Sequence, residues 1–256
     1  MNHLYVKNSH GDTLALDSAG NTGPTLLFIH GWTCRRDYWQ QQLSDLQTDH
    51  RAIALDLSGH GQSAPSSRTE WTISAIADDI VDTLVQTELK DVILVGHSMG
   101  GAVALEAACR TDMVRAVILV DTFVLPYGDL SEEDAQNIEQ PFRNDFAKAI
   151  GELVDNTTGT AMNDSIRRRL KREMGIADPS WALPLWHDLL RWTPDPSFSK
   201  LTVPIHAING DLVPEIARKR CQDHITEWLL PGAGHFPQLE MPDTFNRKLR
   251  DVLSAL

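Results

Sequence analysis

Serine and histidine, two residue types that cooperate in nucleophilic catalysis, stand in glycine-rich stretches far apart in this sequence. Ser98 lies within residues 96–100, Gly-His-Ser-Met-Gly, and His235 within residues 231–237, Pro-Gly-Ala-Gly-His-Phe-Pro. A serine hydroxyl is a weak nucleophile at neutral pH and needs a base within hydrogen-bonding reach. Imidazole suits that task because its unperturbed pKa lies near 6.5, so it can accept the serine proton and later release it. Together the two residues could perform acyl transfer through a serine ester.

The residues around Ser98 indicate how a strand and a helix would position it. Residues 92–95 are an apolar run, and residues 101–109 are small residues and helix formers. A serine in the tight turn between them takes strained backbone angles, and glycines two positions before and after it prevent collisions. The hydroxyl then lies at the helix N-terminus, where free N–H groups favour an anion. Alternatively, the glycines only shape the turn and Ser98 is the helix N-cap.

This G-x-S-x-G pattern between a strand and a helix resembles the nucleophile elbow of the α/β-hydrolase family. Residues 56–63, Asp-Leu-Ser-Gly-His-Gly-Gln-Ser, are similar to the family's D-x-x-G-x-G-x-S loop, in which we interpret His60 as a packing residue. His235 matches the G-x-x-H-F pattern of the family's catalytic histidine. The resemblance implies an acyl-enzyme on Ser98 with His235 as the base, and no motif implies a metal or an organic cofactor.

The resemblance also implies an oxyanion hole. In the family, an H-G-x stretch after an early strand provides one backbone N–H; here residues 30–32, His-Gly-Trp, follow the apolar run at 25–29. The hole would therefore consist of the N–H groups of Trp32 and of Met99, the residue after the nucleophile. His30 is expected to support this loop beside the substrate pocket.

Two acids could orient His235. In most of the family the acid follows the seventh strand as G-x-x-D-x-x-x-P. Asp211 is the nearest match, although it follows Gly210 directly and only two residues separate it from Pro214. A minority of the family places the acid just after strand six, where Asp121 stands. Both choices preserve the order Ser, acid, His. We favour Asp121, which leaves Asp211 as a turn residue.

Apolar runs and helical periodicity alternate from residue 25 onward. This alternation predicts an α/β fold with a mostly parallel, doubly wound sheet of about eight strands. Residues 3–18 predict an antiparallel hairpin at the sheet edge. Because the ligand site of such a sheet lies outside the carboxyl ends of its strands, His30, Ser98 and Asp121 should face one crevice.

The alternation breaks after strand six, where the family inserts its helical cap. Apolar residues at helical spacing cover 130–150, 162–174 and 181–192. We therefore expect a core domain of residues 1–125 and 200–256 and a cap of residues 126–199, divided into short helices by its prolines. Trp186 and Trp192 are expected to line an apolar substrate pocket over the serine, although these aromatic side chains could equally form the core of the cap.

Charge and composition argue against several classes of function. The net charge of −12 without a basic stripe argues against a nucleic-acid partner, and we interpret the basic run at 167–172 as a solvated helix face. Three widely spaced cysteines predict neither a disulfide framework nor a metal site. The N-terminus lacks a signal-peptide pattern and no apolar run reaches about 18 residues, so we expect a soluble, cytoplasmic protein without a membrane partner.

The sequence thus predicts a serine hydrolase that cleaves a carboxylic ester or lactone of a small, apolar substrate; a carbon–carbon bond is another candidate. Serine at the elbow argues against haloalkane dehalogenase and epoxide hydrolase chemistry, for which the family uses aspartate there. One alternative is a cofactor-independent dioxygenase of heteroaromatic rings, a group that the chain resembles in its Gly31-Trp32 loop and around His235. Another is a ligand-binding protein without catalysis. The oligomeric state is left open.

Overall fold

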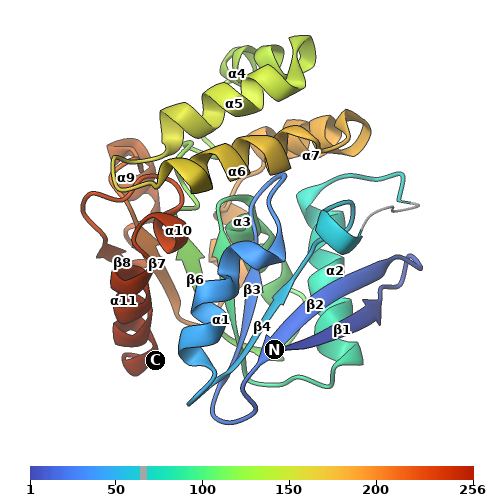
Figure 1. The fold of residues 1–256 in the computed structure, drawn as a ribbon, viewed down its shortest axis with the longest axis vertical. Helices are drawn as coiled ribbons and strands as arrows, with labels where there is room; N and C mark the ends of the chain where they lie inside the picture. Colours follow the sequence, from blue (N-terminus) through green and yellow to red (C-terminus); the bar gives the residue numbers. More distant parts are fainter. Residues whose placement is uncertain (64–67) are drawn as a thin grey trace.

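The computed structural model describes residues 1–63 and 68–256, and over these residues the chain forms an eight-stranded sheet flanked by helices (Figure 1). The strands are β1 (Asn2–Lys7), β2 (Thr13–Ala19), β3 (Thr25–Ile29), β4 (Arg51–Leu55), β5 (Val92–His97), β6 (Val114–Val120), β7 (Ile205–Asn209) and β8 (Thr226–Leu229). Their order in the sheet is β1-β2-β4-β3-β5-β6-β7-β8. From β4 to β8 all neighbours are parallel, whereas β1 and β2 form an antiparallel hairpin at the edge. The predicted fold class is confirmed.

The sheet is covered on both faces because successive side chains of its parallel strands point to opposite sides. The elements that flank it are the short 3₁₀ helices η1 (Arg36–Trp39) and η2 (Gly61–Ser63) and the helices α1 (Gln40–Leu46), α2 (Ile73–Gln86), α3 (Met99–Ala108), α9 (Glu215–Cys221), α10 (Pro237–Glu240) and α11 (Pro242–Ser254). Leu27 and Ile29 of β3 belong to the apolar cluster that includes side chains of α2 and α3. Leu26 and Phe28 belong to the cluster of α1 and α11 on the other face. This packing fixes the strand ends that carry the site.

Five helices lie between β6 and β7, and four of them, labelled α4 to α7, lie over the upper edge of the sheet in Figure 1. The five are α4 (Glu132–Asn144), α5 (Phe146–Thr157), α6 (Asp164–Gly175), α7 (Pro179–Arg191) and α8 (Asp195–Lys200). The helical spacing over 130–150 covers two helices, because Asp145 has extended backbone angles and accepts the N–H of Lys148 as the N-cap of α5. The expectation that prolines divide this segment into short helices holds at helix starts, where Pro179, Pro194 and Pro196 stand. It does not hold at Pro141 and Pro184, which lie inside α4 and α7, where packing of the buried face outweighs one lost N–H donor.

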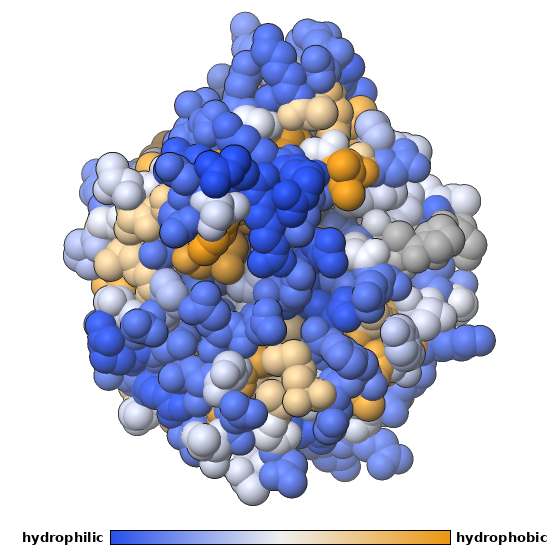
Figure 2. All heavy atoms as spheres, in the orientation of Figure 1, coloured by the Kyte–Doolittle hydropathy of each residue, from blue (hydrophilic) through white to orange (hydrophobic). Residues whose placement is uncertain are grey.

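The face shown in Figure 2 is mostly hydrophilic, with hydrophobic residues in small separate groups. The basic run at 167–172 lies on α6, where Arg169 pairs with Asp37 at 2.7 Å and Lys171 pairs with Asp155. This arrangement agrees with the expected solvated helix face. In the part of the chain that the structure describes, every helix is too short or too polar to cross a membrane.

Candidate active site

The turn between β5 and α3 holds Ser98 in a strained conformation, with φ of 53° and ψ of −124°. Two glycines make this turn possible. A Cβ on Gly96 would lie 2.2 Å from the carbonyl oxygen of Gly100, and one on Gly100 would lie 2.4 Å from that of Ile29. The N–H of Ser98 donates to the carbonyl of Val120 at 2.9 Å, which ties the turn to β6. The geometry is that of the expected elbow, and strain of this kind is concentrated at functional sites.

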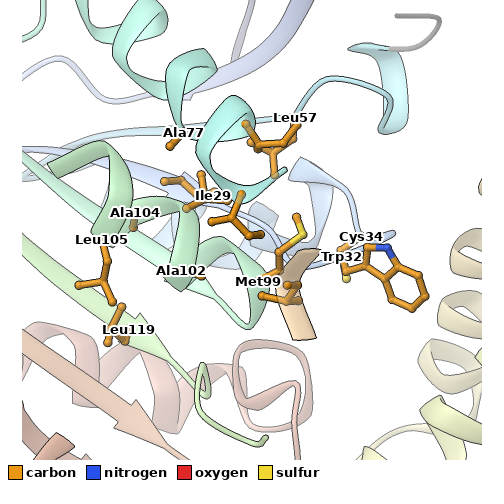
Figure 3. Packing of buried hydrophobic residues seen from close by; sticks show 14 of the residues in the cluster. Ile29, Trp32, Cys34, Leu57, Ala77, Met99, Ala102, Ala104, Leu105 and Leu119 are labelled. Carbon is orange, nitrogen blue, oxygen red and sulfur yellow. The ribbon is translucent and has the colours of Figure 1, made fainter. Parts of the chain in front are cut away.

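Met99 is the first residue of α3, so its backbone N–H has no acceptor within the helix. Its side chain is fully buried and packs in the apolar cluster with Ile29, Leu57 and Ala102 (Figure 3). Packing of the side chain into the core therefore fixes the direction of the backbone N–H beside Ser98. The positive end of the helix dipole lies at the same place.

Ser98, His235 and Asp121 form a continuous hydrogen-bonded chain. Nε2 of His235 lies 3.0 Å from Oγ of Ser98, and its Nδ1 lies 2.7 Å from Oδ2 of Asp121. Asp121 is fully buried, and its Oδ1 accepts the N–H of Gly210 at 2.9 Å. An ionised carboxylate only accepts, so Nδ1 of His235 carries the proton and Nε2 is left free to accept from the serine.

Asp211, the other candidate acid, lies in an exposed turn. Its carboxylate accepts the N–H of Gly232 at 2.8 Å, and its own N–H donates to the carbonyl of Ala233 at 2.9 Å. The structure therefore places Asp121 beside His235 and uses Asp211 to brace the loop that precedes the histidine.

Two buried histidines hold the loop of Trp32. His30 donates from Nδ1 to the carbonyl of Gly31 at 2.8 Å and accepts the N–H of Leu57 at Nε2, at 3.1 Å. Nε2 of His60 accepts the N–H of Thr33 at 3.2 Å. Both rings must be neutral to accept, and burial lowers the pKa of His30 to about 4 and that of His60 to about 3. His30 thus supports the loop but does not line the cavity described below, contrary to expectation.

These histidines predict a loss of stability in mild acid. Their unfolded pKa lies near 6.5, so between pH 6.5 and about 4 the unfolded state binds protons that the folded state excludes. Their contribution is complete above pH 6.5 and is lost as the pH falls. At pH 5 each histidine should cost roughly 2 kcal/mol of unfolding free energy. Urea unfolding of the wild type and His30→Asn at pH 7 and pH 5 tests this, and an equal loss in both proteins would contradict it.

A cavity of about 300 Å³ adjoins Ser98 and His235. Its walls come from the segment after β6 and from α4, α5, α6 and α7, and they include Val124, Leu125, Phe142, Leu153, Met174 and Trp186. Trp32 also lines it and stacks on Trp186, with ring centroids 4.6 Å apart. Trp186 thus takes the first of the two positions that the sequence left open, in the cavity wall. Trp192 does not line the cavity: its Nε1 donates to Glu106 at 3.1 Å and its ring packs on Phe123.

A buried carboxylate that the sequence analysis missed, that of Glu240, holds the loop of His235. Its Oε2 accepts the N–H groups of Gly234 at 2.8 Å and Gly159 at 3.0 Å, and its Oε1 accepts the N–H of Phe236 at 3.0 Å. Gly159 lies between α5 and α6. Glu240 therefore links the helices above the sheet to the loop of the histidine.

The backbone of His235 has two further fixed contacts. Its N–H donates to the carbonyl of Thr157 at 2.7 Å, and its carbonyl lies 2.6 Å from Nε2 of His97. Burial holds the pKa of His97 well below its usual value, so the ring is neutral and Nε2–H donates. A Cβ on Gly234 would lie 2.3 Å from the backbone nitrogen of Gly159, so the two loops are in close contact.

Glu240→Gln should loosen this contact. One carboxylate oxygen that now accepts a backbone N–H would be replaced by an NH₂ group, so two donors would face each other. We expect the free energy of unfolding to fall by about 1–3 kcal/mol and any turnover that depends on the position of His235 to fall about tenfold through its displacement. Glu215→Gln, an exposed glutamate on α9, is the control. Urea unfolding and kcat measure both effects; values equal to those of the control would show that the Glu240 contacts contribute little.

The chain is similar to known proteins in sequence and in fold. The sequence profile described as "Alpha/beta hydrolase family" matches residues 26–248. Epoxide hydrolase 4 of Mus musculus is 32% identical over 123 residues, which are 46% of this chain and 34% of that protein. The chain thus spans about a third of the length of that relative.

Two solved structures superpose over almost the whole chain. A bromoperoxidase from Bacillus anthracis has a TM-score of 0.88 at 23% identity, covering 99% of this chain and 100% of that one. An esterase from Exiguobacterium antarcticum has a TM-score of 0.88 at 17% identity, with the same shares covered. At these identities the likeness shows the fold alone. With the profile match over most of its length and this fold, the chain belongs to the α/β-hydrolase family.

Proposed function

We propose that this protein hydrolyses a carboxylic ester or lactone through an acyl-enzyme on Ser98. The observation that carries the proposal is the chain of hydrogen bonds from Ser98 through His235 to the buried carboxylate of Asp121. A serine, a neutral imidazole with a free Nε2 and an orienting acid are the groups that acyl transfer requires. An esterase is among the proteins that share this fold, so the fold is compatible with the reaction.

In this mechanism Ser98 attacks the carbonyl carbon while His235 takes the hydroxyl proton at Nε2. The N–H groups of Met99 and Trp32 would donate to the oxyanion, and removal of one such donor typically costs about 3–4 kcal/mol of transition-state stabilisation. His235 then gives the proton to the departing alcohol. Water, deprotonated by the same histidine, releases the acid and restores the serine.

The helices of residues 126–199 serve in this proposal as a cap that selects the substrate. They supply much of the cavity wall next to Ser98, and most of the side chains they contribute are apolar. An apolar cavity of about 300 Å³ lies at the lower end of the usual range for ligand sites, which suits a small, apolar substrate.

Intact-mass spectrometry after fluorophosphonate treatment tests the proposal, with turnover of p-nitrophenyl acetate and butyrate measured on the same preparation. We expect one adduct per chain, with turnover lost in step with labelling. Absence of both would reject the hydrolase. Oxygen uptake with hydroxyquinolone-like rings would then favour the dioxygenase, and ligand binding without any turnover would favour a binding protein.

A further inference from the structure

One wall of the cavity beside Ser98 carries a tyrosine hydroxyl that has no hydrogen-bond partner among the described residues. Tyr127 lies after β6, is 1% exposed and lines the cavity. Its ring packs against Phe123 and Trp192, with centroid distances of 6.4 Å and 6.1 Å. Within residues 1–63 and 68–256 its hydroxyl makes no hydrogen bond. Buried tyrosine hydroxyls usually have a partner, so this one is available to a ligand.

The other hydroxyl, amide and indole groups of the wall are bonded to protein, fully enclosed or exposed to solvent. Ser98 and His235 bond to each other, and the hydroxyl of Thr157 donates to the carbonyl of Leu153 at 2.7 Å. The indole N–H of Trp186 also lacks a partner among the described residues, but it is fully enclosed. Asn156 is exposed and belongs to the outer part of the wall. Tyr127 therefore offers the free hydroxyl in the enclosed part.

The groups around Tyr127 determine which ligand groups can bind there. Burial raises the pKa of the phenol, so it remains neutral and protonated at physiological pH. Among the described residues that line the cavity, none is Lys, Arg, Asp or Glu. A substrate carboxylate or ammonium would thus be buried without a counter-charge, which is strongly unfavourable. A neutral oxygen, as in a ketone, ether or alcohol, can take the hydrogen bond without that cost.

We propose that Tyr127 binds a neutral oxygen substituent on the acyl group of the substrate, so that the enzyme prefers esters of short oxo-, alkoxy- or hydroxy-substituted acids to plain alkyl esters. This inference rests on the proposed function. Of the two parts of the ester, we assign the acyl group to the cavity, because it stays attached to Ser98 while the alcohol leaves.

Matched p-nitrophenyl esters test the preference: hexanoate against 4-oxohexanoate and 5-oxohexanoate, which differ from it by a carbonyl in place of a methylene. We expect kcat/KM of the wild type to favour one oxo ester about tenfold, as one hydrogen bond to an otherwise unpaired group allows. In Tyr127→Phe the ratio of oxo to plain ester should fall to about one.

Tyr38→Phe is a matched control, because Tyr38 is also 1% exposed, its hydroxyl also lacks a partner among the described residues, and it is not part of the cavity wall. It should keep the ratio of the wild type. A wild type without preference, or a preference that survives in Tyr127→Phe, overturns the inference while plain-ester turnover and fluorophosphonate labelling leave the hydrolase standing. Absence of labelling and of all ester turnover in the wild type overturns both.

Discussion

Replacing Ser98 with alanine is expected to lower kcat for p-nitrophenyl butyrate about a millionfold and to abolish the fluorophosphonate adduct. In the proposed mechanism the Ser98 hydroxyl both attacks the carbonyl and carries the acyl group, so without it His235 has no nucleophile to activate and no acyl-enzyme can form. In serine hydrolases, loss of the nucleophile alone costs about as much as loss of the whole catalytic unit. Both kcat and the intact mass after labelling should be measured.

Ser44→Ala is the matched control, because Ser44 is an exposed serine on α1. It should label and turn over like the wild type. Ser98→Ala should unfold at the same urea concentration as the wild type, since alanine meets the same backbone strain at φ of 53°. Ester turnover that survives in Ser98→Ala would mean that another group attacks the carbonyl, and the proposed mechanism would be wrong.

The elbow could be predicted from the sequence because its constraints are local. Glycine is needed at 96 and 100 because a Cβ there would lie about 2–3 Å from backbone atoms of β3 and α3. A five-residue sequence pattern is enough to show this requirement. His235 stands in a similarly local pattern. The choice of acid was open because it depends on how two loops fold after β6 and β7. The positive φ of Asp121 and its N–H bond to Ile208 orient its carboxylate in a way that no sequence pattern showed.

The cavity was harder to predict because its wall is assembled from elements far apart in the chain. Trp186 and Trp192 show the difficulty. Six residues correspond to about 600° of helical rotation, so two side chains at this spacing leave a helix about 120° apart. Moreover, α7 ends at Arg191. One tryptophan therefore faces the cavity and the other packs behind it. Composition and spacing alone could not distinguish the two without knowing how α7 packs against α2 and α4.

Asp121→Asn should lower kcat about ten-thousandfold, whereas Asp211→Asn should change it less than threefold. The environment of Asp121 fixes how an asparagine would sit there. Its carbonyl oxygen would keep the N–H of Gly210, now 2.9 Å from Oδ1, and its NH₂ would then face Nδ1 of His235. To accept from that NH₂ the imidazole must carry its proton on Nε2 and cannot take one from Ser98. The wrong tautomer accounts for a loss of this size.

The same substitution at Asp211 removes a charge from a turn, where an asparagine oxygen can still accept the N–H of Gly232. Identical chemistry at both positions makes the comparison of kcat decisive, with urea unfolding to show that both variants are folded. A large loss in Asp211→Asn with a small loss in Asp121→Asn would require the loop after β7 to move its acid to His235 during turnover. That movement would have to break the bonds of Asp211 to Gly232 and Ala233 and displace a buried carboxylate from Nδ1. The bonded arrangement therefore favours Asp121 as the acid that orients the base.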